Sequence, residues 1–338
     1  MRTLIKQPNR DFKVLNLTDT QLSNEEWTDG HLNRNVLEYT VTELVKREKP
    51  DLITISGDLA WANHDHSYEM LANFIDSFGI PWAPVWGNHD NQGGAEATDR
   101  IATKYISTYK NCLYEKGNPA FGNGNYVLLI EENGAPVEAI FMIDSHNQTP
   151  YTDENGEEKM AWARLSEPQM AWMESELDAL KKRGCKDATI VLHIPIYAYR
   201  NAAKAAYKAD IAPRSITLQM ADSEDVWNEE YQDSTGVQYE GIGSYVHNDG
   251  VLEMLKRSGI VRHVICGHDH VNNWKIVYEG VKLIYSLKTG AGCYWVPFMN
   301  GGTVLRINSH GVYNVEDIFV DVQHLLGEDY PVLNPDAL

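Results

Sequence analysis

Cysteine, long apolar runs and basic residues are all scarce in this chain, and each shortage excludes a class of protein. The four cysteines (Cys112, Cys185, Cys266 and Cys293) are widely spaced and form no CxxC pair, so buried reduced thiols are expected rather than disulfides or a zinc site. No apolar run reaches the eighteen residues of a membrane helix. The polar first residues predict no secretory signal, and we expect a cytoplasmic protein.

The charge balance is strongly acidic, with 48 Asp and Glu against 29 Lys and Arg and a formal net charge of −19. Non-specific binding of nucleic acid depends on Lys and Arg that neutralise phosphates, so no nucleic-acid polymer is expected as a partner. A small anionic substrate is not excluded, because bound divalent cations can reverse the field locally.

Short β-branched runs alternate with amphipathic helical stretches, an order typical of α/β folds. The predicted helices are residues 35–48, 68–78, 168–182 and 250–258, and the predicted strands between them include KVLNLTD, DLITISGD, PWAPVWGNHD, NYVLLIEE, EAIFMIDSH, ATIVLHIP and VRHVICGHDH. The chain closes with WKIVYEG, KLIYSLK, GTVLRIN and YNVEDIFV, whose short connections indicate antiparallel strands. Together they predict a four-layer α-β-β-α sandwich of two mixed sheets flanked by helices.

A single domain over residues 1–338 is expected, because layered α/β folds reach this length as one unit. Residues 201–245 have weak periodicity and mix polar, aromatic and acidic side chains, so we interpret them as an insertion. Long excursions of this kind usually form lids or binding loops. A solvated loop without function is the alternative.

Five of the predicted strands end in a turn that carries Asp, Asn or His. They are LNLTD ending at Asp19, ISGD at Asp58, VWGNHD with Asn88, His89 and Asp90, IVLH at His193, and ICGHDH with His268 and His270. Taken singly, a His is more often a hydrogen-bonded core residue, an Asp a helix cap and a Gly a turn former. Their joint order favours one site, because strand ends of a rigid sheet bring polar side chains into a common cleft.

This order of Asp, GD, GNHD, His and GHxH resembles the signature of the calcineurin-like metallophosphoesterases, and all five blocks are present. The resemblance implies two cations bridged by Asp58, with His89 as a catalytic acid paired with Asp90. It places Asp19, Gln21 and His270 on one metal, and Asn88, His193 and His268 on the other. Carboxylate, amide and imidazole donors suit Mn, Fe or Zn, and an Mn/Fe pair is expected.

Gln21 departs from the family pattern, because most members carry His two residues after the first Asp. Its amide oxygen can still coordinate a metal, and some relatives with this DxQ block retain metal-dependent hydrolysis of phosphate esters or diphosphates. Weaker neutral ligation would favour manganese or leave this metal labile. The alternative is a surface Gln without metal contact.

Further residues separate the branches of the superfamily. Trp61 stands where purple acid phosphatases carry the Tyr of GDxxY, so the purple colour is not expected, and GDLAWAN differs from the GDxxDRG of protein Ser/Thr phosphatases. The stretches LSEPQMAWMESEL, LHIPIYAY and GHDHVNNWKIVYEGVKLIYSLKTGAG are similar to a branch of small purple-acid-phosphatase-like proteins.

Outside the motifs, Tyr197, Arg200 and Asn272 are candidates for substrate binding. Arg200 follows His193 and suits phosphate, whereas Asn272 follows GHDH, where Asn more often bonds to backbone. His64 and His66 are interpreted as rim or capping residues. A supporting role is predicted for Asp144 and His146 at the active edge.

The sequence therefore predicts a dinuclear metal-dependent phosphohydrolase that cleaves a small phosphomonoester or phosphodiester by metal-activated hydroxide. One alternative, suggested by the DxQ block and by aromatic residues able to stack a base, is a nucleotide diphosphate or cyclic-nucleotide hydrolase. A metal-binding scaffold without turnover is another. The expected partner is a small phosphorylated substrate, and no binding to a membrane is expected.

Overall fold

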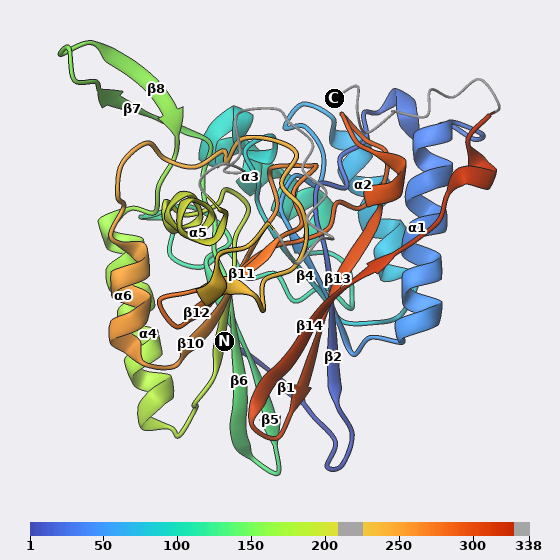
Figure 1. Cartoon of the computed structure of the whole chain (residues 1–338). Helices are drawn as coiled ribbons and strands as arrows, with labels where there is room; N and C mark the ends of the chain where they lie inside the picture. Colours follow the sequence, from blue (N-terminus) through green and yellow to red (C-terminus); the bar gives the residue numbers. More distant parts are fainter. Residues whose placement is uncertain (209–225, 328–338) are drawn as a thin grey trace.

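Two mixed β-sheets lie face to face, and helices cover the outer side of each (Figure 1). The computed structural model describes residues 1–208 and 226–327. The seven-stranded sheet has the order β1 (Arg2–Ile5), β5 (Tyr126–Glu132), β6 (Ala135–Met142), β9 (Ala188–Val191), β10 (Val261–Cys266), β12 (Val281–Tyr285), β11 (Lys275–Tyr278). The five-stranded sheet has the order β14 (Gly311–Phe319), β13 (Gly301–Asn308), β2 (Phe12–Leu17), β3 (Leu52–Ser56), β4 (Trp82–Val85).

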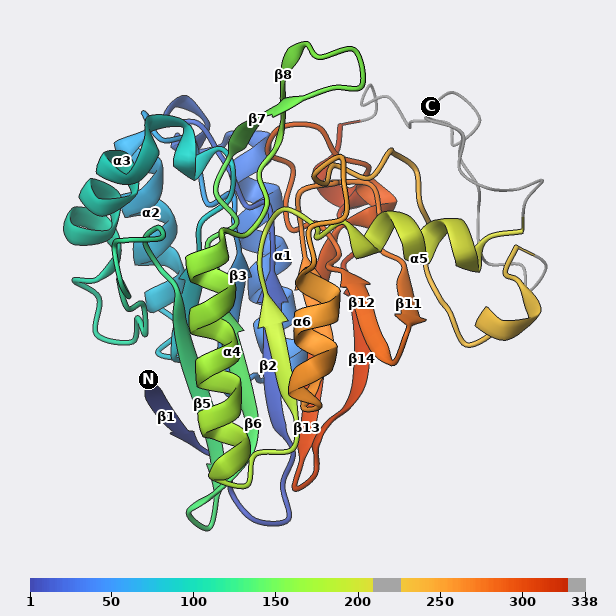
Figure 2. The same ribbon diagram turned by 90° about the vertical axis from the view of Figure 1, so that its left-hand side faces the viewer.

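The helices divide between the two outer faces. α1 (Leu32–Glu48) and α2 (Asp65–Asp76) lie on the side of the five-stranded sheet, and α4 (Glu167–Lys182) and α6 (Val251–Ser258) pack together over the seven-stranded sheet (Figure 2). The remaining helical segments are α3 (Gly94–Ile101), α5 (Ala198–Ala206), η1 (Glu25–Trp27), η2 (Asp90–Gly93), the π-helical η3 (Ala102–Ile106), η4 (Glu229–Tyr231), η5 (Pro297–Met299) and η6 (Gln323–Leu325). The predicted four-layer α-β-β-α fold is confirmed.

Alternation along the strands explains why the layers stack as they do. In β5, Leu128 and Ile130 belong to the core between the sheets, whereas Val127 and Leu129 belong to the core shared with α4. Successive residues of a strand point to opposite faces, so an apolar strand supplies two cores at once. Helix α4 begins at a capping box, in which the Ser166 hydroxyl accepts from the backbone of Gln169.

The four closing strands differ from the sequence prediction in one respect. β11 pairs antiparallel with β12 and β13 pairs antiparallel with β14, as expected. However, β12 and β13 lie in different sheets and are joined by the long segment 286–300, and β13 pairs antiparallel with β2. The chain therefore crosses from one sheet to the other beside the edge where the motif residues lie.

A two-stranded hairpin, β7 (Gln148–Thr152) and β8 (Glu158–Trp162), projects from the sandwich and was not predicted (Figures 1 and 2). Its Cα register places Gln148 opposite Trp162 and Pro150 opposite Met160. The strands are short and mostly exposed, so they lack the apolar alternation that marks a buried strand.

The predicted insertion, 201–245, begins inside helix α5, whose Ala202, Ala203 and Ala206 are buried in the core over the seven-stranded sheet. Residues 226–245 run mainly as loops, and Gln238 forms an isolated bridge with Asn272. The middle of the interval, 209–225, lies outside the described residues. Among the helices of the described ranges, none has the length and apolarity that crossing a bilayer requires.

Candidate metal centre

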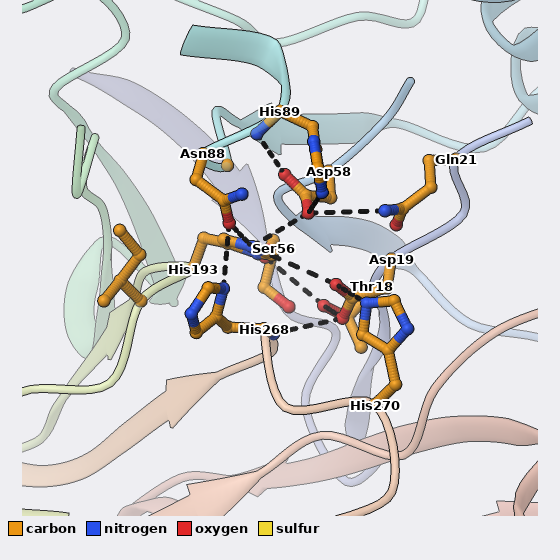
Figure 3. Close-up of polar contacts among 12 residues, drawn as sticks. Thr18, Asp19, Gln21, Ser56, Asp58, Asn88, His89, His193, His268 and His270 are labelled. Carbon is orange, nitrogen blue, oxygen red and sulfur yellow. Dashed lines mark hydrogen bonds and ion pairs between the residues drawn. The ribbon is translucent and has the colours of Figure 1, made fainter. Parts of the chain in front are cut away.

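The motif residues meet at one edge of the two sheets (Figure 3). Three follow neighbouring parallel strands of the five-stranded sheet, and three follow parallel strands of the seven-stranded sheet. In order they are Asp19 after β2, Asp58 after β3, Asn88 after β4, His193 after β9, and His268 and His270 after β10. Parallel strands end on the same side, so both sheets present their carboxyl ends to one cleft.

Asp19, Asp58 and His270 form a compact buried cluster. One ligand atom from each lies within 4.8 Å of the other two, and all three residues are buried. The Nε2 atom of His270 is 3.2 Å from Asp19 Oδ1. Its Nδ1 donates to the Tyr294 carbonyl at 2.8 Å, which leaves Nε2 as the coordinating atom, because a neutral imidazole carries one donor and one acceptor.

Gln21 lies in the same cluster and is fully buried, so the surface position considered for it is wrong. Its Nε2 lies 3.5 Å from Asp58 Oδ2, and its Oε1 has no hydrogen-bond partner among the described residues, as is also true of Asp19 Oδ1. Buried oxygens without partners are costly. A cation held between them would satisfy both.

A second cluster adjoins the first through Asp58. Asn88 Oδ1 is 3.0 Å from His193 Nε2 and 2.8 Å from His268 Nδ1, and His193 Nε2 is 3.2 Å from Asp58 Oδ2. His193 is oriented from behind, because its Nδ1 donates to the Ser56 carbonyl at 2.9 Å. Amide oxygen, imidazole nitrogens and a shared carboxylate suit a second divalent cation, so the donor set fits the implied pair of metals.

The ionisable groups of the centre strongly affect one another's pKa values. Burial opposes ionisation of Asp19, but His270 and His193 outweigh it and hold the pKa of Asp19 well below its ordinary value. Burial likewise lowers the pKa of His193, yet Asp58 and Asp19 raise it to about 9. Burial, reinforced by the charge of His193, lowers the pKa of His268 to about 3. The buried carboxylates thus favour positive charge on His193, as they would favour a bound cation.

The backbone at the centre is strained as well as buried. Asp19, Asp58 and His268 have φ values of 53°, 50° and 77°, a left-handed conformation that costs a non-glycine residue about 1 kcal/mol or more. Gly57 is more than a turn former, because a Cβ there would lie 2.6 Å from the His193 Cβ. The left-handed conformations persist because the surrounding packing, including the close approach of Gly57 to His193, fixes them at this edge of the sheets.

His89 and Asp90 are arranged differently from the prediction. The His89 backbone N–H donates to Asp58 Oδ1 at 2.9 Å, and its ring Nδ1 lies 2.7 Å from the Gln92 amide nitrogen. The predicted pairing of His89 with Asp90 is wrong, because the Asp90 carboxylate points into the protein. It accepts hydrogen bonds from the backbone of Leu59, Ala60 and Gly87 and from the Tyr68 hydroxyl.

The cleft in front of the centre has a volume of about 300 Å³. It is lined by Asp58, Asn88, His89, Trp162, Glu240, Gly241, Gly243, His268, Asp269, His270, Cys293 and Tyr294. No Lys or Arg lines it within the described part of the chain. Phosphate held here would depend on bound cations for charge neutralisation.

The three predicted substrate-binding residues do not line this cleft. The Arg200 guanidinium donates to the hydroxyl and carbonyl of Ser244. The side-chain oxygen of Asn272 accepts from the backbone of Tyr239 and Glu240, and so anchors the loop that carries Glu240. Tyr197 sits at the start of α5, where its backbone donates to Asp249. Their hydrogen bonds instead join α5 and the loop around Glu240 to the neighbouring segments.

Sequence reasoning missed the aromatic and acidic walls of the cleft. The Trp162 ring lies edge-on to His268 at 4.4 Å, and the Tyr294 ring stacks on His270 at 4.1 Å. Glu240 accepts from the Tyr294 hydroxyl at 2.8 Å. Of these residues only Glu240 could have been suspected from the sequence, because it lies in the predicted insertion. Cys185 and Cys266 are buried as expected, whereas Cys112 is partly exposed and Cys293 is exposed in the cleft wall, so the expectation of buried thiols is wrong for these two.

The other polar candidates take supporting positions. His64 precedes α2 and accepts from the Asn24 backbone at 3.0 Å through Nδ1, and His66 lies 3.9 Å from Glu69. His64 also approaches Trp61, whose ring lies 5.7 Å from both the His64 and His89 rings.

Two mixed sheets between helices, with buried carboxylate, amide and imidazole donors at the strand ends, define the metallophosphoesterase class. The sequence model described as calcineurin-like phosphoesterase matches residues 12–272, and the chain belongs to this family. Membership implies a dinuclear metal centre, in agreement with the donor set described above.

Comparison with known proteins gives distant relatives. The chain is 24% identical over 321 residues to phosphatase DCR2 of Saccharomyces cerevisiae, covering 89% of this chain and 51% of that protein. It is 28% identical over 273 residues to probable inactive purple acid phosphatase 14 of Arabidopsis thaliana, covering 73% and 60%. The chain thus spans only about half to three fifths of these curated relatives.

Among solved structures, a dimetal phosphatase from Danio rerio superposes with a TM-score of 0.54 at 14% sequence identity, covering 91% of this chain and 98% of that one. At this level of sequence identity, the similarity shows a shared fold alone. It agrees with the layered architecture described above.

Proposed function

We propose that this chain is a dinuclear metal-dependent hydrolase of small phosphate esters. The observation that supports this most is the convergence of seven buried donor residues from both sheets. Asp19, Gln21 and His270 would hold one ion, Asn88, His193 and His268 the other, and Asp58 would bridge them. When bound, the ions supply Lewis acidity that activates water and neutralises charge on the phosphoryl oxygens. Manganese and iron suit these donors best, with zinc as a further choice.

His89 would assist the departure of the leaving group. Because the amide nitrogen of Gln92 donates to His89 Nδ1, the proton of the neutral ring resides on Nε2. That atom lies 4.0 Å from Asp58 Oδ2, at the cleft wall. From there Nε2–H can donate a hydrogen bond to the departing alkoxide oxygen and stabilise the negative charge that develops on it. Asp90 would act as a positioning residue, since it fastens the loop that carries His89.

The proposal is tested by assaying purified protein on 4-nitrophenyl phosphate with added Mn²⁺, Fe²⁺ or Zn²⁺. Asp58→Asn should remove more than 99% of turnover and lower the bound metal, because a neutral amide cannot bridge two cations as a carboxylate does. His66→Ala is the matched control, since His66 is exposed and does not line the cleft. Full turnover by Asp58→Asn would contradict the proposal.

The name of the Arabidopsis relative keeps a scaffold without turnover as the second candidate. In that case the protein would bind metal stoichiometrically, and no phosphate ester would be hydrolysed with any of the three ions. The hydrolysis of nucleotide diphosphates is less well supported, because no cationic side chain of the described residues lines the cleft to receive a second phosphate.

A further inference from the structure

A second pocket, with a volume of about 390 Å³, opens beneath the β7–β8 hairpin. Its walls come from the turn after β4, the start of α3, the loop around Gly122 and the segment that leads into β7. None of the predicted metal ligands lines it. The residues used in the following argument are Asn91, Asp144, His146, Asn147, Gln148 and Met160.

The hairpin register joins this pocket to the metal cleft. Gln148 lies directly opposite Trp162 on the neighbouring strand, and opposite residues of an antiparallel pair share one face, with Cβ atoms about 5 Å apart. Met160 lies two residues before Trp162 and so points to the same face. Gln148 and Met160 line the second pocket, whereas Trp162 lines the metal cleft. One hairpin face therefore roofs both.

The floor of the second pocket is likewise continuous with the floor of the metal cleft. His89 lines the metal cleft, and Asn91, two residues later in the same turn, lines the second pocket. The Asn91 amide nitrogen donates to Asp144 Oδ1 at 2.9 Å and to the Gly87 carbonyl at 3.1 Å. This side chain ties the turn after β4 to the segment after β6, so the two compartments share a wall.

The pocket is already formed in the structure. His146 has φ of 62°, and its ring is held by Gln169 Oε1, 2.8 Å from Nε2, and by Asp144 Oδ2, 3.5 Å from Nδ1. Across from it, a Cβ at Gly122 would lie 2.7 Å from Asp144 Oδ2. Left-handed backbone at a non-glycine residue and close backbone approach are common at ligand sites.

The lining favours an uncharged ligand rich in hydroxyl groups. The lining includes no Lys or Arg, and the carboxylate of its acid, Asp144, would repel a phosphate group. The side chains of Asn147 and Gln148 make no hydrogen bond to any described residue, so their amides are available to a ligand. Met160 is 58% exposed and offers an apolar edge to C–H groups. Amides beside an apolar edge match the alternating O–H and C–H surfaces of a sugar.

We propose that this pocket binds the leaving group of the phosphate ester, and that this group is a sugar or another neutral polyol. The inference rests on the proposed function, because the phosphoryl group would lie in the metal cleft while the alcohol extends beneath the hairpin. Trp162, at the junction, would separate the two parts of the substrate.

The test compares two substrates with the metal-loaded protein: 4-nitrophenyl phosphate, whose leaving group has no alcohol hydroxyls, and a hexose monophosphate. The double variant Asn147→Ala/Gln148→Ala should lower kcat/KM for the hexose phosphate by roughly tenfold, since each lost hydrogen bond is worth several-fold. It should change the value for the aryl phosphate by less than about twofold. Thr149→Ala on the opposite hairpin face is the matched control and should alter neither.

The outcomes separate the two proposals. No turnover of either substrate by the wild-type protein with any of the three ions overturns the proposed function, and the pocket inference falls with it. Turnover of the aryl phosphate with no selective loss of the hexose phosphate in the double variant overturns the pocket inference alone. Both altered side chains are at the surface of the hairpin segment, and matching melting temperatures would show that the variants are folded.

Discussion

At the scale of single residues, Asp90 and Gln21 depart most from the simplest interpretation of the motifs. The Asp90 carboxylate connects the loop after β3 to the loop after β4 and to Tyr68 on α2. Burial, reinforced by the charge of Asp58, raises its pKa to about 7. Gln21 brings a neutral oxygen into a centre rich in charge, and that oxygen has no partner among the described residues.

Replacing Gln21 should separate fold stability from metal affinity. In Gln21→Leu the unpartnered buried oxygen is lost, so the free energy of unfolding of the metal-free protein should rise by about 1 kcal/mol. The affinity for one of two manganese ions should fall at least tenfold if this oxygen is a ligand. Urea denaturation and calorimetric titration measure the two effects. A variant that binds both ions as tightly as wild type would remove Gln21 from the ligand set.

At the scale of elements, β6 and β9 carry a buried acid pair at the ends remote from the metal centre. Glu138 on β6 accepts from the Thr189 hydroxyl at 2.9 Å, and Asp187, just before β9, accepts from the Val312 backbone at 2.9 Å. Burial, together with Asp187, raises the pKa of Glu138 well above its ordinary value, and burial raises the pKa of Asp187 to about 6. Glu138 Oε2 and Asp187 Oδ1 have no hydrogen-bond partner among the described residues, which suits a proton shared between the two acids.

This pair should make the fold sensitive to pH. Because both folded pKa values are raised, the native state binds more protons than the unfolded state, so the free energy of unfolding falls as pH rises from about 4 through 6 and beyond. Glu138→Gln keeps the shape of the protonated acid and removes its ionisation. Between pH 5 and pH 8 the variant should lose roughly 2 kcal/mol less stability than wild type.

Urea titrations at the two pH values measure this difference. Glu157→Gln serves as the control, because Glu157 is exposed in the hairpin turn, and it should follow the wild-type profile. Parallel pH profiles for wild type and Glu138→Gln would contradict the shared proton.

The elements also show how much of the structure could be predicted from the sequence. β2, β3 and β10 are mostly buried and rich in apolar residues, so their runs were recognisable, and the motif turns followed directly from them. Helix α1 starts at Leu32 rather than 35 because its first turn is partly exposed and carries little periodic signal. The hairpin has almost no buried face, and the direction of Arg200 depends on how α5 packs. Local periodicity determines neither the long-range packing nor the order of the strands in a sheet.

At the scale of the whole molecule, the centre belongs to both sheets, and segment 286–300 crosses between them within the same region. Lys288 in that segment is fully enclosed, and its ammonium donates to the Asp19 carbonyl at 2.8 Å. Because the cores share strands, we propose that residues 1–338 form one domain with residues 201–245 inserted, as the sequence indicates.

Removing the metals should show whether the chain unfolds as a single domain. A ligand that binds only the native state stabilises it by about 2.7 kcal/mol at a hundred times its dissociation constant, so chelation should lower the melting temperature by a few degrees. A single domain predicts one calorimetric transition before and after chelation. Two separate transitions, of which only one responds to the chelator, would contradict the single-domain proposal.

The division of the ligands between two sheets has a consequence for the order of assembly. Neither half of the chain alone can present a complete set of donors, so we expect an ion to bind tightly only after the layers have docked. Metal capture would then be the final event of maturation, and newly made protein would pass through a finished but idle form that becomes competent only when the cell supplies the ions.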